Sequence, residues 1–385
     1  MTTLAAALPH RISDPADIPP EQVYEGLLHL LALPPGPARD VMLGSVLTGL
    51  LLRGPRPDEV EAAVRAALSL DQPVPQHRPP KRARVVGYTG SGKKAFKTFN
   101  ISTAASLVAA AGGAHVAKLG SHSASSVTGS RDFMQHVGAL RVRVPAEDMC
   151  ALTVELGFGF FSIEDRIPEF DHRYGGRFQS IHALSLGLPA LLSPIECDSF
   201  VYGLAHPAVG TSAALLTSLG MTDISVVSSE MPGGRHVDEL LPGGTVRTCR
   251  LVSGAPDLDI AASLTTAVAG HPFEPSSVAQ HGDARRNVSR ALRVLAGRGT
   301  SGAADAVALN AALLMTVSGV ATSFSDGVKR ARHVVSSDAA LDVLITFIRA
   351  TGGSDAELWS LLDDTEQTSV GTGPGREMSC SLVKS

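Results

Sequence analysis

Near the start of the chain, hydrophobic residues recur at helical spacing in three segments. Residues 21–33, 38–52 and 58–70 each place aliphatic side chains three and four positions apart, which is the period of one face of an α-helix. A proline- and charge-rich stretch follows at residues 72–84 and is typical of a linker. The pattern predicts a small N-terminal helical domain over residues 1–75, completed by part of the later helices.

Beyond the linker, short apolar runs of strand length alternate with alanine-rich runs of helical length. Such alternation is typical of an α/β fold and predicts an α/β domain over residues 76–353. From residue 354 the chain turns polar and rich in glycine and serine, which predicts a mobile C-terminal tail over residues 354–385. Within it, residues 354–364 have enough apolar positions for a turn or two of helix. The predicted strands are 85–86, 115–118, 140–144, 199–204 and 224–227, and the predicted helices are 102–111, 130–137, 211–220, 303–318 and 325–335.

The composition indicates a folded globular protein. Of 385 residues, 44% are hydrophobic and 18% are charged, which supplies a core and is too little charge for a disordered chain. The net charge of -4 disfavours a surface built for nonspecific nucleic-acid binding. No apolar run reaches membrane-spanning length and no secretory signal precedes the first helix, so we expect a cytoplasmic protein without a membrane partner. The four cysteines show no spacing typical of a zinc site or a disulfide framework.

A glycine-rich loop follows the first predicted strand. Residues 87–94 read GYTGSGKK, and closely spaced glycines let backbone amides approach an anion without obstruction by a Cβ atom. The text is reminiscent of a P-loop, but that motif requires serine or threonine after its lysine, and Lys94 stands there. The loop therefore predicts a phosphate site that is not a Walker motif.

Two further segments repeat this chemistry. Residues 98–103 read TFNIST directly before an alanine-rich helix, and residues 118–126 read KLGSHSASS directly after a short strand. Hydroxyl and amide donors at a helix N-terminus favour anions, although each such segment alone is also an ordinary helix cap. Three such loops in one chain predict a single anion-binding site built from residues 85–138.

These segments together resemble one family. Residues 90–138 are similar, without gaps, to the stretch of anthranilate phosphoribosyltransferases that reads GTGGD, TFNIST, KHGNRSxSS, GSAD and LG. Asp238-Glu239 and Asn310 also fall in the family order. The resemblance implies a small helical domain hinged to a larger α/β domain with a central mixed sheet. It further implies 5-phosphoribosyl diphosphate (PRPP) and Mg²⁺ in the cleft, a small aromatic acceptor, and a homodimer.

The resemblance also implies roles for individual residues. Hard carboxylate oxygens such as those of an Asp-Glu pair suit Mg²⁺, and a guanidinium suits an acceptor carboxylate. Arg173 is an alternative to Arg177 for that contact if a small gap is allowed. The implied PRPP-binding residues are Gly90, Ser91, Gly92, Lys93, Asn100, Ser102, Thr103, Lys118, Ser123 and Ser126; the catalytic residues are Lys118, Asn100 and Lys94; the acceptor-binding residues are Arg177, His122 and Asn100; and the metal ligands are Ser102, Asp238 and Glu239.

The chain departs from the family text at several of these positions. Gly92-Lys93-Lys94 stands where the family reads Gly-Gly-Asp. Either the two lysines grip the diphosphate and partly replace metal, since ammonium groups are effective point charges for phosphate, or the site has degenerated or takes another anion. Leu119, Ser121 and His122 replace the family's His, Asn and Arg. These changes put the identity of the acceptor in question.

We therefore predict a phosphoribosyltransferase that displaces diphosphate from PRPP with an aromatic or heteroaromatic acceptor, either anthranilate or a relative used in specialised metabolism. One alternative is a nucleoside phosphorylase-like enzyme, whose KxSTGG-type loop is missing here. Another is an altered family member that binds nucleic acid or another polyanion, which we consider the less favoured interpretation. That alternative rests on a cluster of basic residues at Lys81, Arg82, Arg84, Lys93, Lys94 and Lys97.

Overall fold

The structure is a computed structural model of the chain. It describes residues 8–12, 18–73, 75–80, 83–252 and 273–363. Residues 253–272 and 364–385 thus lie outside the description, as do Lys81 and Arg82.

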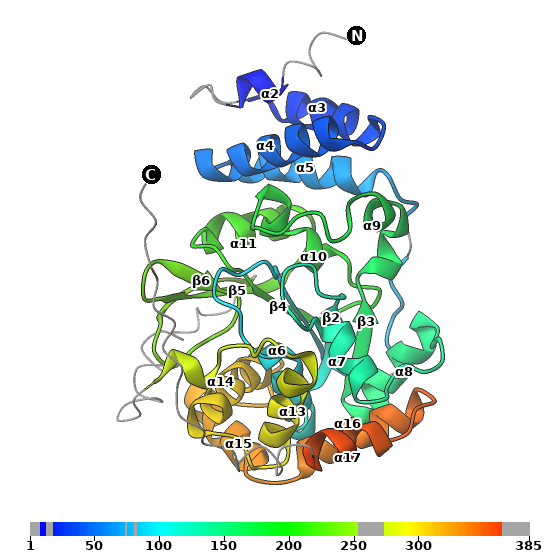
Figure 1. Ribbon diagram of the computed structural model, residues 1–385, viewed down its shortest axis with the longest axis vertical. Coiled ribbons are helices and arrows are strands. Elements are labelled where there is room, and N and C mark those ends of the chain that lie inside the picture. The colour runs from blue at the N-terminus through cyan, green and yellow to red at the C-terminus, as the bar shows by residue number, and fades with distance from the viewer. Residues whose placement is uncertain (1–7, 13–17, 74, 81–82, 253–272, 364–385) are drawn as a thin grey trace, which may run out of the picture.

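The N-terminal helices stack at one end of the molecule, above the sheet (Figure 1). They are α2 (Leu8–Arg11), α3 (Pro20–Ala32), α4 (Pro37–Arg53) and α5 (Pro57–Leu68). The last three each begin with a proline in the first turn, where its fixed φ suits the helix and its missing N–H is not needed. The three helices predicted in this region are confirmed, and so is the fold class, an N-terminal helical unit followed by an α/β domain with a mixed sheet.

Seven strands form one mixed sheet. Five of them run parallel in the order β3-β2-β1-β4-β5, and β6 and β7 pair antiparallel with β5. The parallel strands are buried along most of their length, as expected of strands covered on both faces. Their bounds are β1 (Val85–Gly90), β2 (His115–Gly120), β3 (Phe158–Ser162), β4 (Ser199–Gly203), β5 (Asp223–Met231), β6 (Arg235–Val237) and β7 (Thr245–Val252).

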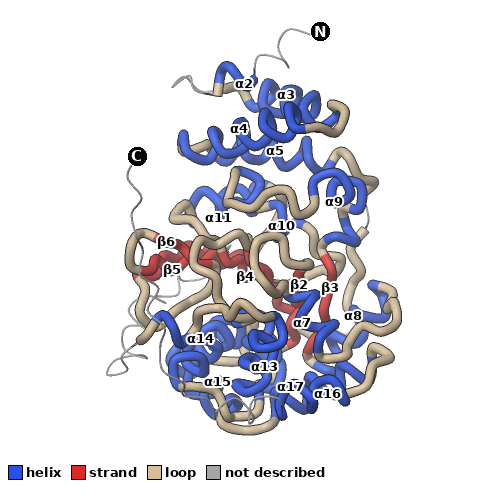
Figure 2. The backbone as a smooth tube through the Cα atoms, viewed as in Figure 1, coloured by secondary structure: helices blue, strands red, loops and turns tan. Residues whose placement is uncertain are grey.

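Helices cover both faces of the sheet (Figure 2). One group lies on the side of the sheet away from the N-terminal helices: α6 (Ile101–Ala111), α13 (Ala284–Leu295), α14 (Ser301–Val317), α15 (Phe324–Val335), α16 (Ala339–Ala350) and α17 (Ala356–Asp363). Between the sheet and the N-terminal helices lie α9 (Pro168–Tyr174), α10 (Leu188–Leu191) and α11 (Val209–Ser218). Two further helices, α7 (Ser130–His136) and α8 (Ala146–Leu156), flank β2 and β3.

The strand order reverses at β1. The chain runs from β1 outward through β2 to β3, and then returns to place β4 on the other side of β1. In open α/β sheets a ligand crevice forms outside the carboxyl ends of the strands at such a reversal, because the loops leave in opposite directions. The ends of β1, β2 and β4, at Gly90, Gly120 and Gly203, therefore mark where a ligand site is expected.

Two expectations from the sequence need correction. Residues 140–144 form no strand, because Arg141, Val142 and Arg143 are exposed and β3 is the edge of the sheet on that side. The tail does not begin at residue 354, because α17 packs Leu358, Leu361 and Leu362 into the core. The remainder of the expected tail lies outside the described residues. The other predicted strands and helices are confirmed within a few residues of their ends, whereas the pattern does not predict β3, β6 or β7.

No helix in the described part of the chain is both long and apolar enough to cross a membrane.

Candidate functional site

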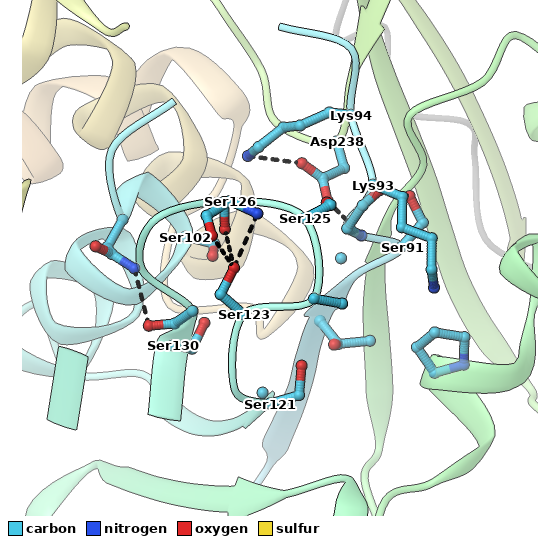
Figure 3. A pocket seen from close by; sticks show the side chains of 18 of the residues that line it. Ser91, Lys93, Lys94, Ser102, Ser121, Ser123, Ser125, Ser126, Ser130 and Asp238 are labelled. Carbon is cyan, nitrogen blue, oxygen red and sulfur yellow. Dashed lines mark hydrogen bonds and ion pairs between the residues drawn. The ribbon is translucent and has the colours of Figure 1, made fainter. Parts of the chain in front are cut away.

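One cavity opens at the carboxyl ends of β1 and β2, and we call it the phosphate cavity. It gathers the three loops that the sequence analysis singled out, together with a segment more than a hundred residues away that follows β6 (Figure 3). Of the fifteen residues predicted for the site, all but Thr103 and Arg177 line it: Gly90, Ser91, Gly92, Lys93, Lys94, Asn100, Ser102, Lys118, His122, Ser123, Ser126, Asp238 and Glu239.

The glycine loop is held between β1 and β4. The Ser91 amide donates to the Gly203 carbonyl oxygen at 2.8 Å, and the Ala205 amide donates to Ser91 Oγ at 2.9 Å. The chain then turns through two left-handed residues, Gly92 at φ 60° and Lys93 at φ 56°. A non-glycine residue in this region costs roughly 1–2 kcal/mol, so Lys93 keeps a strained backbone where the family text has glycine.

Four lysine side chains reach the phosphate cavity. The Lys97 ammonium donates to Ser125 Oγ at 2.8 Å, and the Lys118 ammonium donates to the Leu119 carbonyl oxygen at 2.7 Å. Lys94 pairs with the acidic residues, whereas Lys93 has no partner among the described residues and points away from Asp238 (Figure 3). Burial lowers the pKa of Lys93 to about 8, helped by Lys97, and burial likewise lowers the pKa of Lys118 to about 8. Ammonium groups so poorly solvated are ready to bind phosphate oxygens.

The serine loop, residues 121–126 after β2, is held in place by the Asp132 carboxylate. Asp132 Oδ2 accepts hydrogen bonds from the amides of Ser123 and Gly129 at 2.9 Å and 2.8 Å, and Oδ1 lies 2.5 Å from His122 Nδ1. Although burial raises the pKa of Asp132, the hydrogen bonds from His122, Gly129 and Ser123 lower it overall. The loop thereby places the Ser123 and Ser126 hydroxyls, 2.8 Å apart, at the wall of the cavity.

The start of α6 forms the next wall. Asn100 Nδ2 donates to the carbonyl oxygens of Thr128 and Gly129 at 3.3 Å and 3.2 Å, which leaves Asn100 Oδ1 buried without a partner among the described residues. Ser102 lines the cavity beside it. Thr103 does not: it is fully buried, and its side chain points about 100° away from that of Ser102 around the helix axis. The contact of Thr103 with PRPP stays a prediction, and Thr103 is not part of the cavity wall.

The acidic pair closes the cavity opposite the serine loop. Asp238 Oδ2 accepts the Gly92 amide at 2.9 Å, and Glu239 Oε1 accepts the Thr98 hydroxyl at 3.3 Å. Burial and the charge of Asp238 raise the pKa of the Glu239 carboxyl against the opposing effect of Lys94. The described residues contain no cluster of three or more acidic, histidine or cysteine ligands for a metal. Because the Lys94 ammonium already lies against both carboxylates, the pair as arranged does not fit a divalent cation.

A second cavity, which we call the aromatic cavity, adjoins the phosphate cavity and shares Lys93, His122 and Pro189 with it. It extends toward α9 between apolar and aromatic side chains. The Asp171 carboxylate also faces it and has no partner among the described residues. Burial, with Glu164 nearby, raises the pKa of Asp171. The apolar and aromatic residues that line it are Ile163, Ile167, Phe170, Tyr174, Phe178, Leu188 and Leu192.

Neither arginine proposed for acceptor binding lines these cavities. Arg177 Nη1 pairs with Asp40 Oδ2 of α4 at 3.0 Å, and Arg173 forms an ion pair with Glu169 one helical turn earlier. Each guanidinium is thus neutralised by a local carboxylate, which a sequence alignment cannot show. His122 lies at the border of the two cavities, as its predicted role requires.

Several residues of the site were missed by the sequence analysis. In the sequence, Lys97 stands out only as part of a basic cluster, and Asp132 only as part of a predicted helix. The aromatic residues of α9, Phe170 and Tyr174, are four positions apart. This spacing indicates that they share one face of a helix, but it does not show that the face borders a cavity.

The chain is similar to known proteins over most of its length. Residues 82–341 match the glycosyl transferase family, a/b domain. The anthranilate phosphoribosyltransferase of Thermus thermophilus is 33% identical over 335 residues, which cover 86% of this chain and 95% of that protein. The enzyme of the same name from Stenotrophomonas maltophilia is 29% identical over 326 residues, covering 82% of this chain and 89% of that protein.

Solved structures share the fold. The crystal structure of anthranilate phosphoribosyltransferase from Thermus thermophilus superposes with a TM-score of 0.70 at 29% identity, covering 91% of this chain and 99% of that one. The Saccharomyces cerevisiae enzyme in complex with PRPP and Mg gives a TM-score of 0.69 at 21% identity, covering 91% of this chain and 99% of that one.

Proposed function

The chain belongs to the anthranilate phosphoribosyltransferase family and is a pentosyltransferase, and we propose that it transfers a phosphoribosyl group from PRPP to an aromatic or heteroaromatic acceptor. PRPP with Mg²⁺ binds in the phosphate cavity, and the acceptor binds in the aromatic cavity. An acceptor used in specialised metabolism is favoured over anthranilate because Leu119, Ser121 and His122 depart from the family text.

One observation carries this proposal. Four ammonium groups, the serine loop and the start of α6 converge on a single cavity at the reversal of the strand order. PRPP carries a diphosphate and a separate phosphate, and clustered cations with hydroxyl and amide donors suit several phosphate groups at once. Asn100 and Ser102 line the cavity, and Asn100 Oδ1 is buried without a partner among the described residues; the side-chain oxygen atoms of these two residues would hold the Mg²⁺ that accompanies PRPP.

The reaction is a displacement at C1 of the ribose. The bond from C1 to the diphosphate oxygen breaks and its electron pair leaves with diphosphate. The acceptor nitrogen supplies the pair for the new bond and then loses its proton to solvent. Lys118 and Lys93 border the cavity where negative charge grows on the departing diphosphate, and fixed cations in a poorly hydrated site stabilise that charge without reorganising. Mg²⁺, when bound, neutralises further diphosphate charge. Catalysis then consists of positioning and electrostatics.

The aromatic cavity explains why the acceptor should be a flat ring. Tyr174 packs between Phe170 and Phe178, with ring centroids 5.2 Å and 6.4 Å away, and all three line the cavity. Since Lys93 and Asp171 have no hydrogen-bond or ion-pair partner among the described residues, they rather than Arg177 would meet the polar substituents of the acceptor. An N–H group of the acceptor suits the Asp171 carboxylate.

The function is tested by calorimetric titration of the full chain with PRPP in the presence of Mg²⁺, and by an assay of diphosphate release across anthranilate, hydroxybenzoates and amino-heteroaromatic compounds. We expect saturable PRPP binding and diphosphate release with at least one amino-heteroaromatic compound. Absence of PRPP binding would overturn the proposal. Diphosphate release with anthranilate alone would support the phosphoribosyltransferase activity and reject the proposal of a specialised-metabolism acceptor.

We expect Asp171→Asn to raise the KM of the acceptor about tenfold, because it removes a charge that faces the aromatic cavity. Arg177→Ala should change that KM by less than about twofold, since Arg177 is engaged with Asp40 outside the cavity. Steady-state kinetics with the active acceptor measures both, and PRPP affinity should stay unchanged in each variant. A larger effect of Arg177→Ala would restore the assignment that the alignment suggests.

PRPP binding and stability should respond to pH in opposite directions. As pH rises through about 8, Lys93 and Lys118 lose their charge in the folded chain and PRPP binding weakens. In the unfolded chain both lysines keep their protons until their ordinary pKa near 10.4. The unfolded state then binds more protons between these values, so the free energy of unfolding rises from pH 8 toward pH 10. Calorimetry with PRPP and urea denaturation across this range check both trends.

A homodimer through the N-terminal helices is also proposed. Val41 and Leu52 are 67% and 80% exposed, and both belong to α4. Large exposed apolar side chains on one helix indicate a contact surface. Leu52→Asp should shift the chain from dimer to monomer in light scattering, whereas the same change at the isolated exposed Val142 should not. A monomeric parent chain would reject this assembly.

Three of the basic residues on which the polyanion alternative rests lie inside the phosphate cavity. Lys93, Lys94 and Lys97 line the cavity rather than an open surface, and Lys94 is engaged with two carboxylates. Arg84 is exposed, while Lys81 and Arg82 lie outside the described residues.

A further inference from the structure

The acidic pair already holds a cation. Lys94 Nζ lies 2.9 Å from Asp238 Oδ1 and donates a hydrogen bond to Glu239 Oε1, and Figure 3 shows the Lys94 side chain reaching across to Asp238. The ammonium therefore sits between the two carboxylates. This is the place that a divalent cation would occupy if the pair were a metal site.

The surroundings hold this arrangement in place. Asp238 and Glu239 are buried, with side-chain exposures of 7% and 3%, and the Lys94 side chain is 13% exposed. The backbone of Gly92, two residues before Lys94, donates to Asp238, and Thr98 donates to Glu239. Such contacts orient both carboxylates toward Lys94, so the pairing does not depend on a mobile surface side chain.

Charge opposes a metal ion at the same position. A divalent cation bound to either carboxylate would lie beside a buried ammonium, and like charges at such a distance repel strongly where water is excluded. The family text places an acidic residue at position 94, so the lysine reverses the charge there from negative to positive. Relative to the family text, Lys94 thus removes one carboxylate next to Asp238 and Glu239 and adds one positive charge in its place.

We propose that the Lys94 ammonium permanently takes the place of a divalent cation at the Asp238–Glu239 pair, so that the chain binds PRPP with no metal ion at this pair. The inference deepens the proposed function, because it concerns the metal requirement of the same cavity. It predicts that any Mg²⁺ accompanying PRPP lies on the Asn100 and Ser102 side, away from the pair.

The test measures metal binding without PRPP, so its outcome does not depend on the proposed function. Mn²⁺ is titrated into the full chain and followed by electron paramagnetic resonance of the free ion. We expect no Mn²⁺ site at the pair in the parent chain, and one additional site per chain in Lys94→Asp, which restores the family residue. Lys94→Met, which keeps the length of the side chain, should gain the same site more weakly and serves if Lys94→Asp fails to fold.

Two controls locate the gained site. Adding Asp238→Asn to Lys94→Asp should remove it, because a carboxylate ligand is lost. Lys97→Met removes a neighbouring cavity ammonium that does not contact the pair, and it should gain no Mn²⁺ site. A parent chain that binds Mn²⁺ and loses it on Asp238→Asn would overturn the proposal, as would Lys94 variants that gain nothing.

A second arm uses PRPP. We expect its affinity for the parent chain to fall less than about tenfold when EDTA replaces Mg²⁺, and the fall to exceed about a hundredfold in Lys94→Asp. An equal, steep dependence on Mg²⁺ in both proteins would contradict the role of Lys94. Failure of PRPP to bind under any condition would instead reject the proposed function and leave the Mn²⁺ result standing.

Discussion

Lys118→Met is expected to weaken PRPP binding about a hundredfold while leaving the chain as stable as the parent or more stable. Lys118 is 2% exposed. Among the described residues its ammonium donates only to the adjacent carbonyl oxygen, and it lies 5.2 Å from the centroid of the Tyr88 ring. Loss of a charged hydrogen bond to a ligand costs about 1.5–3 kcal/mol. A buried ammonium without a carboxylate partner destabilises the free protein, and methionine of similar length removes that cost.

Calorimetry with PRPP and urea denaturation in its absence measure the two effects separately. Lys97→Met is the matched control: it also removes a cavity ammonium, but one that is more exposed and bonded to a serine hydroxyl, so a smaller loss of affinity is expected. If Lys118→Met loses stability and affinity together, Lys118 acts in the fold rather than on the ligand. Unchanged PRPP affinity would remove Lys118 from the site.

Gly203→Ala is expected to destabilise the chain by about 3 kcal/mol and to abolish PRPP binding. A Cβ atom at Gly203 would lie 1.9 Å from the backbone carbonyl oxygen of Asp238. That contact joins the end of β4 to the acidic pair, and neither backbone can move without breaking hydrogen bonds of the sheet or the glycine loop. Overpacking of this kind costs about 1–3 kcal/mol in a well-packed core, and here it also displaces Asp238 from Lys94.

Gly210→Ala provides the control within the same chain. A Cβ atom at Gly210 meets nothing within 4 Å, and the residue lies in the first turn of α11. Alanine is favoured over glycine in a helix by up to about 1 kcal/mol, so this variant should be as stable as the parent or more stable. Urea denaturation measures the free energy of unfolding of both variants. A Gly203→Ala protein whose free energy of unfolding is within about 0.5 kcal/mol of the parent's would show that the close approach of Gly203 to Asp238 is not required.

The local periodicity of the chain was enough to predict most of the helices and the parallel strands. Segments such as residues 21–33 or 303–318 carry their structure in the spacing of their own apolar side chains, and the burial of one face follows from that spacing. The run at residues 140–144 has the side chains of a strand but no neighbouring strand to pair with, so its pattern misled. Strand pairing depends on two segments, and the spacing of apolar residues within one segment does not show whether a partner strand lies beside it.

For the site, the sequence by itself determined which loops meet at one cavity, because glycines and hydroxyl donors next to strand ends are local features and parallel strands bring their ends together. Only the tertiary structure decided how the charged residues pair. Lys94 and Glu239 are 145 residues apart, and Arg177 and Asp40 are 137 apart. Coulomb attraction depends on distance in space and on burial, and neither is encoded in the spacing of residues along the chain. Of the two lysines that the sequence offered as a grip on diphosphate, Lys94 is therefore found holding the acidic pair instead.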